Sequence, residues 1–213
     1  MAFDTQILDL VNSTFDDQIA MDGWAADGAK QLINMMPREL KEKCTTETTL
    51  NHSATTMDMD GVGEVLYVNR LSADSGGSRI PCRKVPSMYG ELSNDSNSLY
   101  KASATDPVYW ILSSGDTAIL NVIPAPTANQ TAIVYHVAYP SIVGSDVSVI
   151  ANFPDELEYL VVLYAAIKII ERQLIEEEDN ELYVPIVTTL KQDYGQGLQL
   201  SGLIKQAKAE GQK

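Results

Sequence analysis

The chain has 213 residues, of which 45% are hydrophobic, and its 29 acidic and 15 basic side chains give a formal net charge of −14. This length permits one large domain or two small ones, and the acidic balance argues against a protein that grips nucleic acid on a basic face. The longest apolar stretch, from Tyr159 to Ile170, is interrupted by Lys168 and falls short of the roughly 18 residues that a transmembrane span needs. The sequence therefore predicts a globular protein with no membrane partner.

The two cysteines, Cys44 and Cys82, lie far apart and form no CxxC motif or His/Cys cluster. We predict that both are reduced and structural, as in an intracellular protein. The N-terminus has no basic region followed by a long apolar core, so it does not resemble a signal peptide.

Residues 3–43 have the periodicity of helices. Apolar residues at helical spacing in 3–11 predict a first helix. Asp22 is a candidate N-cap for a second helix, and Pro37 is expected to end or kink it.

From Thr45 the apolar period changes to two, which indicates β-strands. Strands are predicted at 64–71, 80–86, 107–112, 117–123 and 131–139, with loops at 72–79 and 93–98. The last two strands are expected to form a hairpin through the 124–130 connection. His136 alternates with the face of Tyr135 and Val137, and we predict that it lies on the strand surface.

The stretch 153–179 predicts the central helix of the fold. It is apolar on all sides between Tyr159 and Ile167, which is typical of a fully buried helix. Pro154 suits a first helical position, and the acidic run 176–179 is expected near the helix end because the dipole repels anions there. Four-residue spacing from Leu182 to Tyr194 predicts one more helix, with glycines 195 and 197 as its stop signals.

This pattern predicts an α+β fold. Helices from both chain ends form one bundle, with a small antiparallel β-sheet or sandwich inserted between its halves and an extended C-terminal tail. The expected domains are 1–44 and 141–197 for the two halves of the bundle, 45–140 for the inserted β domain, and 198–213 for the tail.

The sequence offers little evidence for catalysis. Asp58, Asp60 and Glu64 flank two glycines, but a ligand position of a calcium loop is missing, so a solvated turn explains them better than a metal site. There is no GxSxG, P-loop or GxGxxG motif, and nothing near His136 in the sequence offers the pair of nucleophile and orienting carboxylate that catalysis through it would need. We therefore predict no enzyme activity, no metal and no cofactor.

Several segments, in a fixed order, resemble the head–tail adaptor proteins of tailed bacteriophages, also called connector, head-completion or tail tubular proteins. They include Trp24–Lys30 with Leu32-Ile33-Asn34 and Pro37, then Ile80-Pro81-Cys82, and a Ser-Leu-Tyr-Lys-Ala-Ser step before Pro107-x-Tyr109. The most characteristic piece is FPDELEYLVVLYAAIKII at 153–170. The order of these elements matches over nearly the whole chain.

The resemblance implies a structural role in the virion neck, after assembly in the host cytoplasm. In that family a ring, usually of twelve copies, sits below the portal protein at the capsid vertex. The bundle lines a channel through which genomic DNA passes during packaging and ejection, the β insertion faces outward or toward the downstream tail or nozzle protein, and the C-terminal segment reaches into the portal. An acidic channel wall fits this role, because it repels phosphates.

Two sets of residues are candidates for interfaces. Val162, Ile169 and Ile170 lie around the central helix from its other apolar residues, and we predict that they contact neighbouring copies in a closed ring. In the tail, Leu200, Leu203, Ile204 and Ala207 fall on one face of a helix. With Lys205 and Lys208 they are the predicted docking residues for the portal: Leu200, Leu203, Ile204, Lys205 and Lys208.

Two alternatives stay open. The β insertion is suited to a tail-associated binding module that recognises a receptor or anchors a fibre, and an enzyme with an unrecognised site remains the third reading. Size in solution separates them, since an adaptor is expected to enter rings when its portal is present.

Overall fold

A computed structural model describes residues 2–11, 15–72, 77–115, 117–142, 149–176 and 183–203. The chain divides into two compact units, one of residues 1–44 with 139–213 and the other of residues 45–138. We call these the helical unit and the β unit. The α+β prediction, with N-terminal and C-terminal helices packed together around an insertion, is confirmed.

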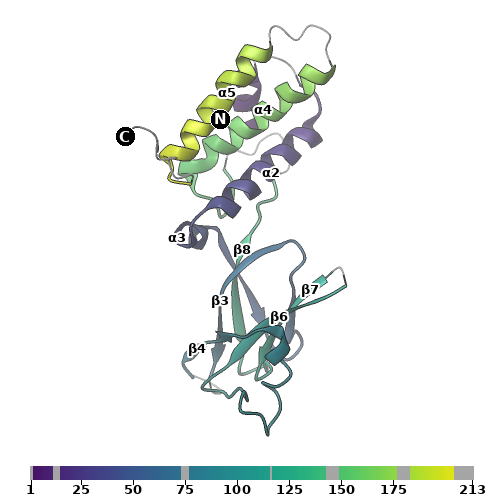
Figure 1. Ribbon diagram of the computed structural model, residues 1–213, viewed down its shortest axis with the longest axis vertical. Coiled ribbons are helices and arrows are strands. Elements are labelled where there is room, and N and C mark those ends of the chain that lie inside the picture. Colours follow the sequence, from purple (N-terminus) through teal and green to yellow (C-terminus); the bar gives the residue numbers. More distant parts are fainter. Residues whose placement is uncertain are drawn as a thin grey trace, which may run out of the picture. The chain divides into compact units, whose positions relative to one another are not determined.

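The helical unit is built around α4, Glu158–Glu176, which is preceded by a turn of 3-10 helix at Asp155–Leu157. The other helices are α1 (Phe3–Val11), α2 (Gln18–Met35), α3 (Arg38–Lys41) and α5 (Tyr183–Leu200). α1, α2 and α5 all pack against α4, and Figure 1 shows α2 and α5 running alongside it. The prediction of a buried central helix is confirmed along most of α4, because Leu160, Val161, Ala165, Ile169 and Ile170 are buried among three neighbouring helices of the same chain, while Tyr159 and Ile175 near its ends stay exposed.

Glycines set how closely the helices approach α4. A Cβ on Gly28 of α2 would lie 2.8 Å from the ring of Tyr164, and a Cβ on Gly197 of α5 would lie 2.5 Å from a methyl carbon of Leu160. The prediction that Gly197 and Gly195 stop the last helix is therefore wrong. α5 continues to Leu200, since the lack of a side chain at Gly197 is what lets it pack on α4.

The start of α2 also differs from the prediction. Asp17, and not Asp22, is the N-cap: its Oδ1 accepts from the Ala20 N–H at 3.0 Å, and its Oδ2 accepts from Arg172 of α4 at 2.8 Å. The helix starts one turn early because one carboxylate both caps it and ties it to α4.

The β unit contains two four-stranded sheets. Its strands are β1 (Thr45–Leu50), β2 (Thr56–Asp58), β3 (Val62–Leu71), β4 (Arg79–Pro81), β5 (Arg83–Lys84), β6 (Val108–Ser114), β7 (Thr117–Ile123) and β8 (Ala132–Ala138). One sheet has the order β1-β8-β3-β4 and the other the order β2-β7-β6-β5. All pairs are antiparallel except β5 with β6. Figure 1 labels β3, β4, β6, β7 and β8 among these strands.

The two sheets share one core, to which each contributes its inward face. Its buried members include Leu50, Val68 and Val134 from the first sheet and Met57 and Leu120 from the second. A smaller cluster joins Val85 and Ala102, from the segment between β5 and β6, to Val108 and Trp110 of β6. The inserted unit is thus a small sandwich.

Two strand assignments were wrong in detail. The predicted hairpin of 117–123 with 131–139 does not form, because β7 and β8 belong to different sheets; β7 instead pairs with β6, from Ser114 opposite Thr117 to Val108 opposite Ile123. The single strand predicted at 80–86 is two short strands that separate at Cys82 and enter different sheets. Period-two patterning identifies strands but not their partners.

Candidate interaction surfaces

The predicted ring-interface residues are not exposed in the single chain. Ile169 and Ile170 are fully buried, at 0% exposure, and Val162 is 4% exposed. The expectation that they keep free apolar surface is wrong, because α1, α2 and α5 together cover the sides of α4. Val162 is one of the residues that line a surface hollow.

That hollow is one of two that share Tyr159, and together we call them the Tyr159 groove. One, of about 410 Å³, is lined by Gln6, Asp9, Leu10, Tyr159, Val162 and Leu163. The other, of about 390 Å³, is lined by Leu40, Glu156, Leu157, Tyr159, Leu200 and Ser201. Tyr159 is 45% exposed and Leu200 87% exposed, so apolar side chains stand open to solvent along the groove. A contiguous exposed apolar surface of this kind often marks a site that contacts another protein.

The predicted docking tail is described only in part. Leu200 is the last residue of α5 and Leu203 is half-buried, whereas Ile204, Lys205 and Lys208 lie outside the described residues. α5 ends in a Schellman motif: the Leu203 N–H donates to the Leu198 carbonyl and the Gly202 N–H to the Gln199 carbonyl, both at 3.1 Å, with Gly202 at φ +72°. Leu200 and Leu203 therefore do not share a helical face, and that part of the prediction is wrong.

The β unit carries an exposed apolar segment of its own, residues 87–102, which we call the apolar loop. Met88, Leu92 and Tyr100 are exposed and Leu99 is fully exposed. The sequence predicted a loop at 93–98 but did not predict that apolar residues on either side of it are exposed. Four large apolar side chains within 13 positions of a loop-rich region were the signal that could have indicated this surface. Of the other predicted loop, 72–79, residues 73–76 lie outside the described part of the chain.

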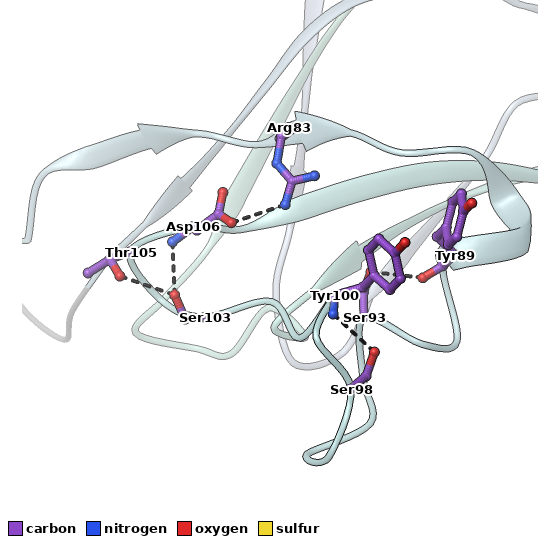
Figure 2. A network of polar contacts seen from close by, with 8 residues as sticks. All are labelled: Arg83, Tyr89, Ser93, Ser98, Tyr100, Ser103, Thr105 and Asp106. Atoms are coloured by element: carbon purple, nitrogen blue, oxygen red, sulfur yellow. Dashed lines mark hydrogen bonds and ion pairs between the residues drawn. The ribbon is translucent and has the colours of Figure 1, made fainter.

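Hydrogen bonds and ring contacts hold the apolar loop in one shape (Figure 2). Buried Ser93 donates its hydroxyl to the Tyr89 carbonyl at 2.8 Å, and its own carbonyl accepts from the Ala102 N–H at 2.9 Å. The rings of Tyr89 and Tyr100 lie 4.7 Å apart between centroids. At the base, Arg83 pairs with Asp106 at 3.0 Å, and the Asp106 N–H donates to the Ser103 hydroxyl. A prearranged loop with exposed apolar side chains is suited to binding a protein, since little ordering remains to be done.

Sequence reasoning missed Arg70, the charged side chain buried in the β unit at 2% exposure. It follows Leu66 and Val68 on the inward face of β3, and this alternation was the signal for it. Its guanidinium makes four hydrogen bonds, to the carbonyls of Pro124, Ala125 and Leu71 and to Gln130 Oε1. Burial lowers the pKa of Arg70 from its usual value. Arg70 thus fastens the β7–β8 connection to β3.

The side chains considered for catalysis or metal binding have structural roles. His136 is buried, not on the strand surface as predicted: its Nε2 lies 3.1 Å from the Thr48 hydroxyl and its Nδ1 lies 3.3 Å from the Val137 carbonyl. Because a carbonyl only accepts, the Val137 contact is made by a protonated Nδ1. Asp58 accepts from the Asp60 N–H, forming the predicted turn. Among the described residues, no three His, Cys, Asp or Glu side chains are grouped to hold a metal ion.

The two cysteines are buried and unpaired with each other. Burial raises the pKa of the Cys44 thiol to about 11 and that of Cys82 to about 12. Both are therefore protonated at neutral pH. Within the described part of the chain, no helix is long and apolar enough to cross a membrane.

Exposed apolar side chains on both units are typical of a protein that acts through contacts with other proteins. A family model described as SU10 adaptor protein matches residues 3–209, nearly the whole chain. The chain belongs to this family and is a phage head–tail adaptor, as the resemblance predicted. Its role is structural and it binds other virion proteins. No curated protein matches the chain at a significant level.

Proposed function

We propose that copies of this adaptor form a closed ring, of twelve subunits, below the portal protein in the virion neck. The ring extends the channel for genomic DNA and provides the attachment site for the downstream tail or nozzle protein. The observation that carries the proposal is the family match over residues 3–209.

The ring contact is proposed to use apolar side chains that the helical unit leaves exposed. Ile19, at the start of α2, is 86% exposed beside a hollow lined by Gly23, Ala26 and Ile142. Ile175, near the end of α4, is similarly exposed. A contact that joins two different patches repeats from copy to copy and closes into a ring when the rotation permits. These residues replace Ile169 and Ile170, which the single chain buries.

The acidic balance of the chain supports a role as a channel wall. With 29 acidic and 15 basic residues, the subunit repels phosphates on average. Phosphate contacts supply most of the affinity in non-specific DNA binding. DNA that meets no basic surface passes along such a wall without being held.

The C-terminal segment is proposed to dock on the portal. Leu203, Ile204, Lys205 and Lys208 remain the candidates, and the Schellman turn at Gly202 makes Leu203 the first residue of the docking segment. Apolar side chains supply most of the affinity in such contacts, while complementary charge speeds docking.

The apolar loop is proposed to bind the downstream tail protein. Met88, Leu99 and Tyr100 are exposed on a loop held by its own hydrogen bonds, and exposed aromatic and methionine side chains are enriched in protein interfaces. The helical unit and the β unit then serve different partners.

The test uses portal-bearing heads mixed with purified adaptor variants, followed by sedimentation and electron microscopy. A chain that stops after Leu203 is expected to lose attachment to heads, whereas Leu99→Ser is expected to attach but fail to join tails. Leu112→Ser, which changes an exposed leucine of β6 outside the loop, is the matched control and keeps both steps. The proposal is wrong if the truncated chain attaches and retains DNA as well as the full chain does.

A further inference from the structure

The Tyr159 groove lies where the described chain stops. Leu200 and Ser201 line its second hollow, and Leu203 follows directly after the Schellman turn. An extended chain advances about 3.3–3.6 Å per residue, so the ten residues after Leu203 reach at most about 33–36 Å from it. Residues 204–213, which lie outside the described part, therefore begin at the rim of an open apolar groove.

The groove and this segment carry opposite charge. The charged residues that line the groove are Asp9 and Glu156. Lys43 pairs with Glu156 at 2.7 Å in an exposed contact, while no described basic side chain pairs with Asp9. Residues 204–213 contain Lys205, Lys208 and Lys213 against a single glutamate. The segment is therefore net basic in an acidic chain, and its charge favours it as the occupant of a groove lined by carboxylates.

The apolar surfaces also match. Leu10, Tyr159 and Leu200 are exposed along the groove, and Leu40 and Leu157 lie deeper in it. The segment offers Ile204 and Ala207 to cover them. Its short tether to α5 makes the contact intramolecular, with an effective concentration in the millimolar range for short flexible linkers. A contact of modest affinity is then sufficient.

We propose that in the unassembled chain residues 204–213 bind in the Tyr159 groove of the same molecule, with Ile204 against its apolar wall and the lysines facing Asp9 and Glu156. The inference concerns the free chain and does not require portal docking. If the tail also docks on the portal, the portal and the groove compete for it, and the groove is uncovered only when a head is present.

A spin label on the tail tests this contact. Gln206→Cys adds one accessible thiol and leaves the apolar and basic residues of the segment in place. Because burial holds the pKa of Cys44 near 11 and that of Cys82 near 12, the new cysteine is labelled selectively at neutral pH. In dilute labelled protein we expect paramagnetic broadening of amide signals in α1 and in the first turn of α4, and loss of this broadening when the label is reduced.

Charge variants provide the controls. Asp9→Lys is expected to abolish most of the broadening, whereas Asp27→Lys, which makes the same charge change in a separate hollow on α2, retains it. Raising the ionic strength from about 0.05 M to about 0.5 M should weaken the broadening, since exposed charges are then screened. No broadening at these amides, or equal effects of the two variants, overturns the proposal. Broadening that appears only between labelled and isotope-enriched unlabelled chains assigns the groove to a second copy and also overturns it.

Discussion

Two glycines in α5 provide a sharp test of how the helical unit packs. Gly195 and Gly197 lie two positions apart in one helix, but only Gly197 faces α4. A Cβ there would lie 2.5 Å from Leu160 Cδ2 and 2.8 Å from the Tyr159 hydroxyl, whereas nothing lies within 4 Å of a Cβ on Gly195. Tyr159 is half-exposed and can yield, but Leu160 is fully buried and cannot move without displacing its neighbours.

The two alanine variants should therefore differ in the sign of their effect. Replacing a helical glycine with alanine stabilises by roughly 0.5–1 kcal/mol when the site has room, so Gly195→Ala should raise the free energy of unfolding by about that amount. Gly197→Ala gains the same helix propensity but adds an overpacking cost of about 1–3 kcal/mol. Its net effect is expected to lie between neutral and about 2.5 kcal/mol of destabilisation.

Urea unfolding followed by far-ultraviolet circular dichroism measures both variants, because the helical unit dominates the helical signal. The difference between the two midpoints isolates the packing cost, since the change in propensity is common to both. Equal stabilisation by the two substitutions would refute the close approach of α5 to α4 at Gly197.

Three further predictions follow from buried or paired groups. Arg70→Met should destabilise the β unit by at least about 2 kcal/mol, measured by urea unfolding, because four oxygen atoms lose a charged donor. The hydrogen bond from Lys168 lowers the pKa of Glu171 from its ordinary value of 4.5. The Glu171 carboxylate therefore stabilises the fold above pH 4.5, and this contribution is lost as the pH falls through the lowered pKa. Glu171→Gln should remove this part of the acid sensitivity when the free energy of unfolding is measured as a function of pH. Cys44 and Cys82 should react with a thiol reagent at neutral pH only as fast as the fold opens, and rapid labelling of the native chain would contradict their burial.

The sequence predicted the helix–sheet–helix order because the apolar period changes near Thr45 and again before Phe153. Continuous apolar patterning from Tyr159 to Ile167 identified α4 as the buried helix, which the structure confirms. The pattern does not show which helices pack around α4. The prediction that Ile169 and Ile170 contact neighbouring copies is therefore wrong, because α1, α2 and α5 of the same chain bury them.

The errors in the β unit have a common physical cause. Strands of both sheets alternate in the same way, so short connections suggested a hairpin for β7 and β8 where the chain crosses between sheets. Alternation with Tyr135 and Val137 predicts a surface position for His136, whereas His136 is buried and hydrogen-bonded to Thr48. The prediction that Gly197 ends α5 is wrong because it considers only the low helix propensity of glycine. Packing against α4 requires a residue without a side chain at this position, and the helix continues past it.

The pairing of β1 with β8 determines how the β unit is inserted. Thr45 lies opposite Val137, so the strands through which the chain enters and leaves this unit are hydrogen-bonded neighbours, about 5 Å apart. Once that ladder forms, the two halves of the helical bundle are joined across the width of one strand pair and no longer across a long flexible loop. The entropic cost of closing that loop is met within the insertion, and any replacement module whose ends are similarly paired should permit the bundle to assemble.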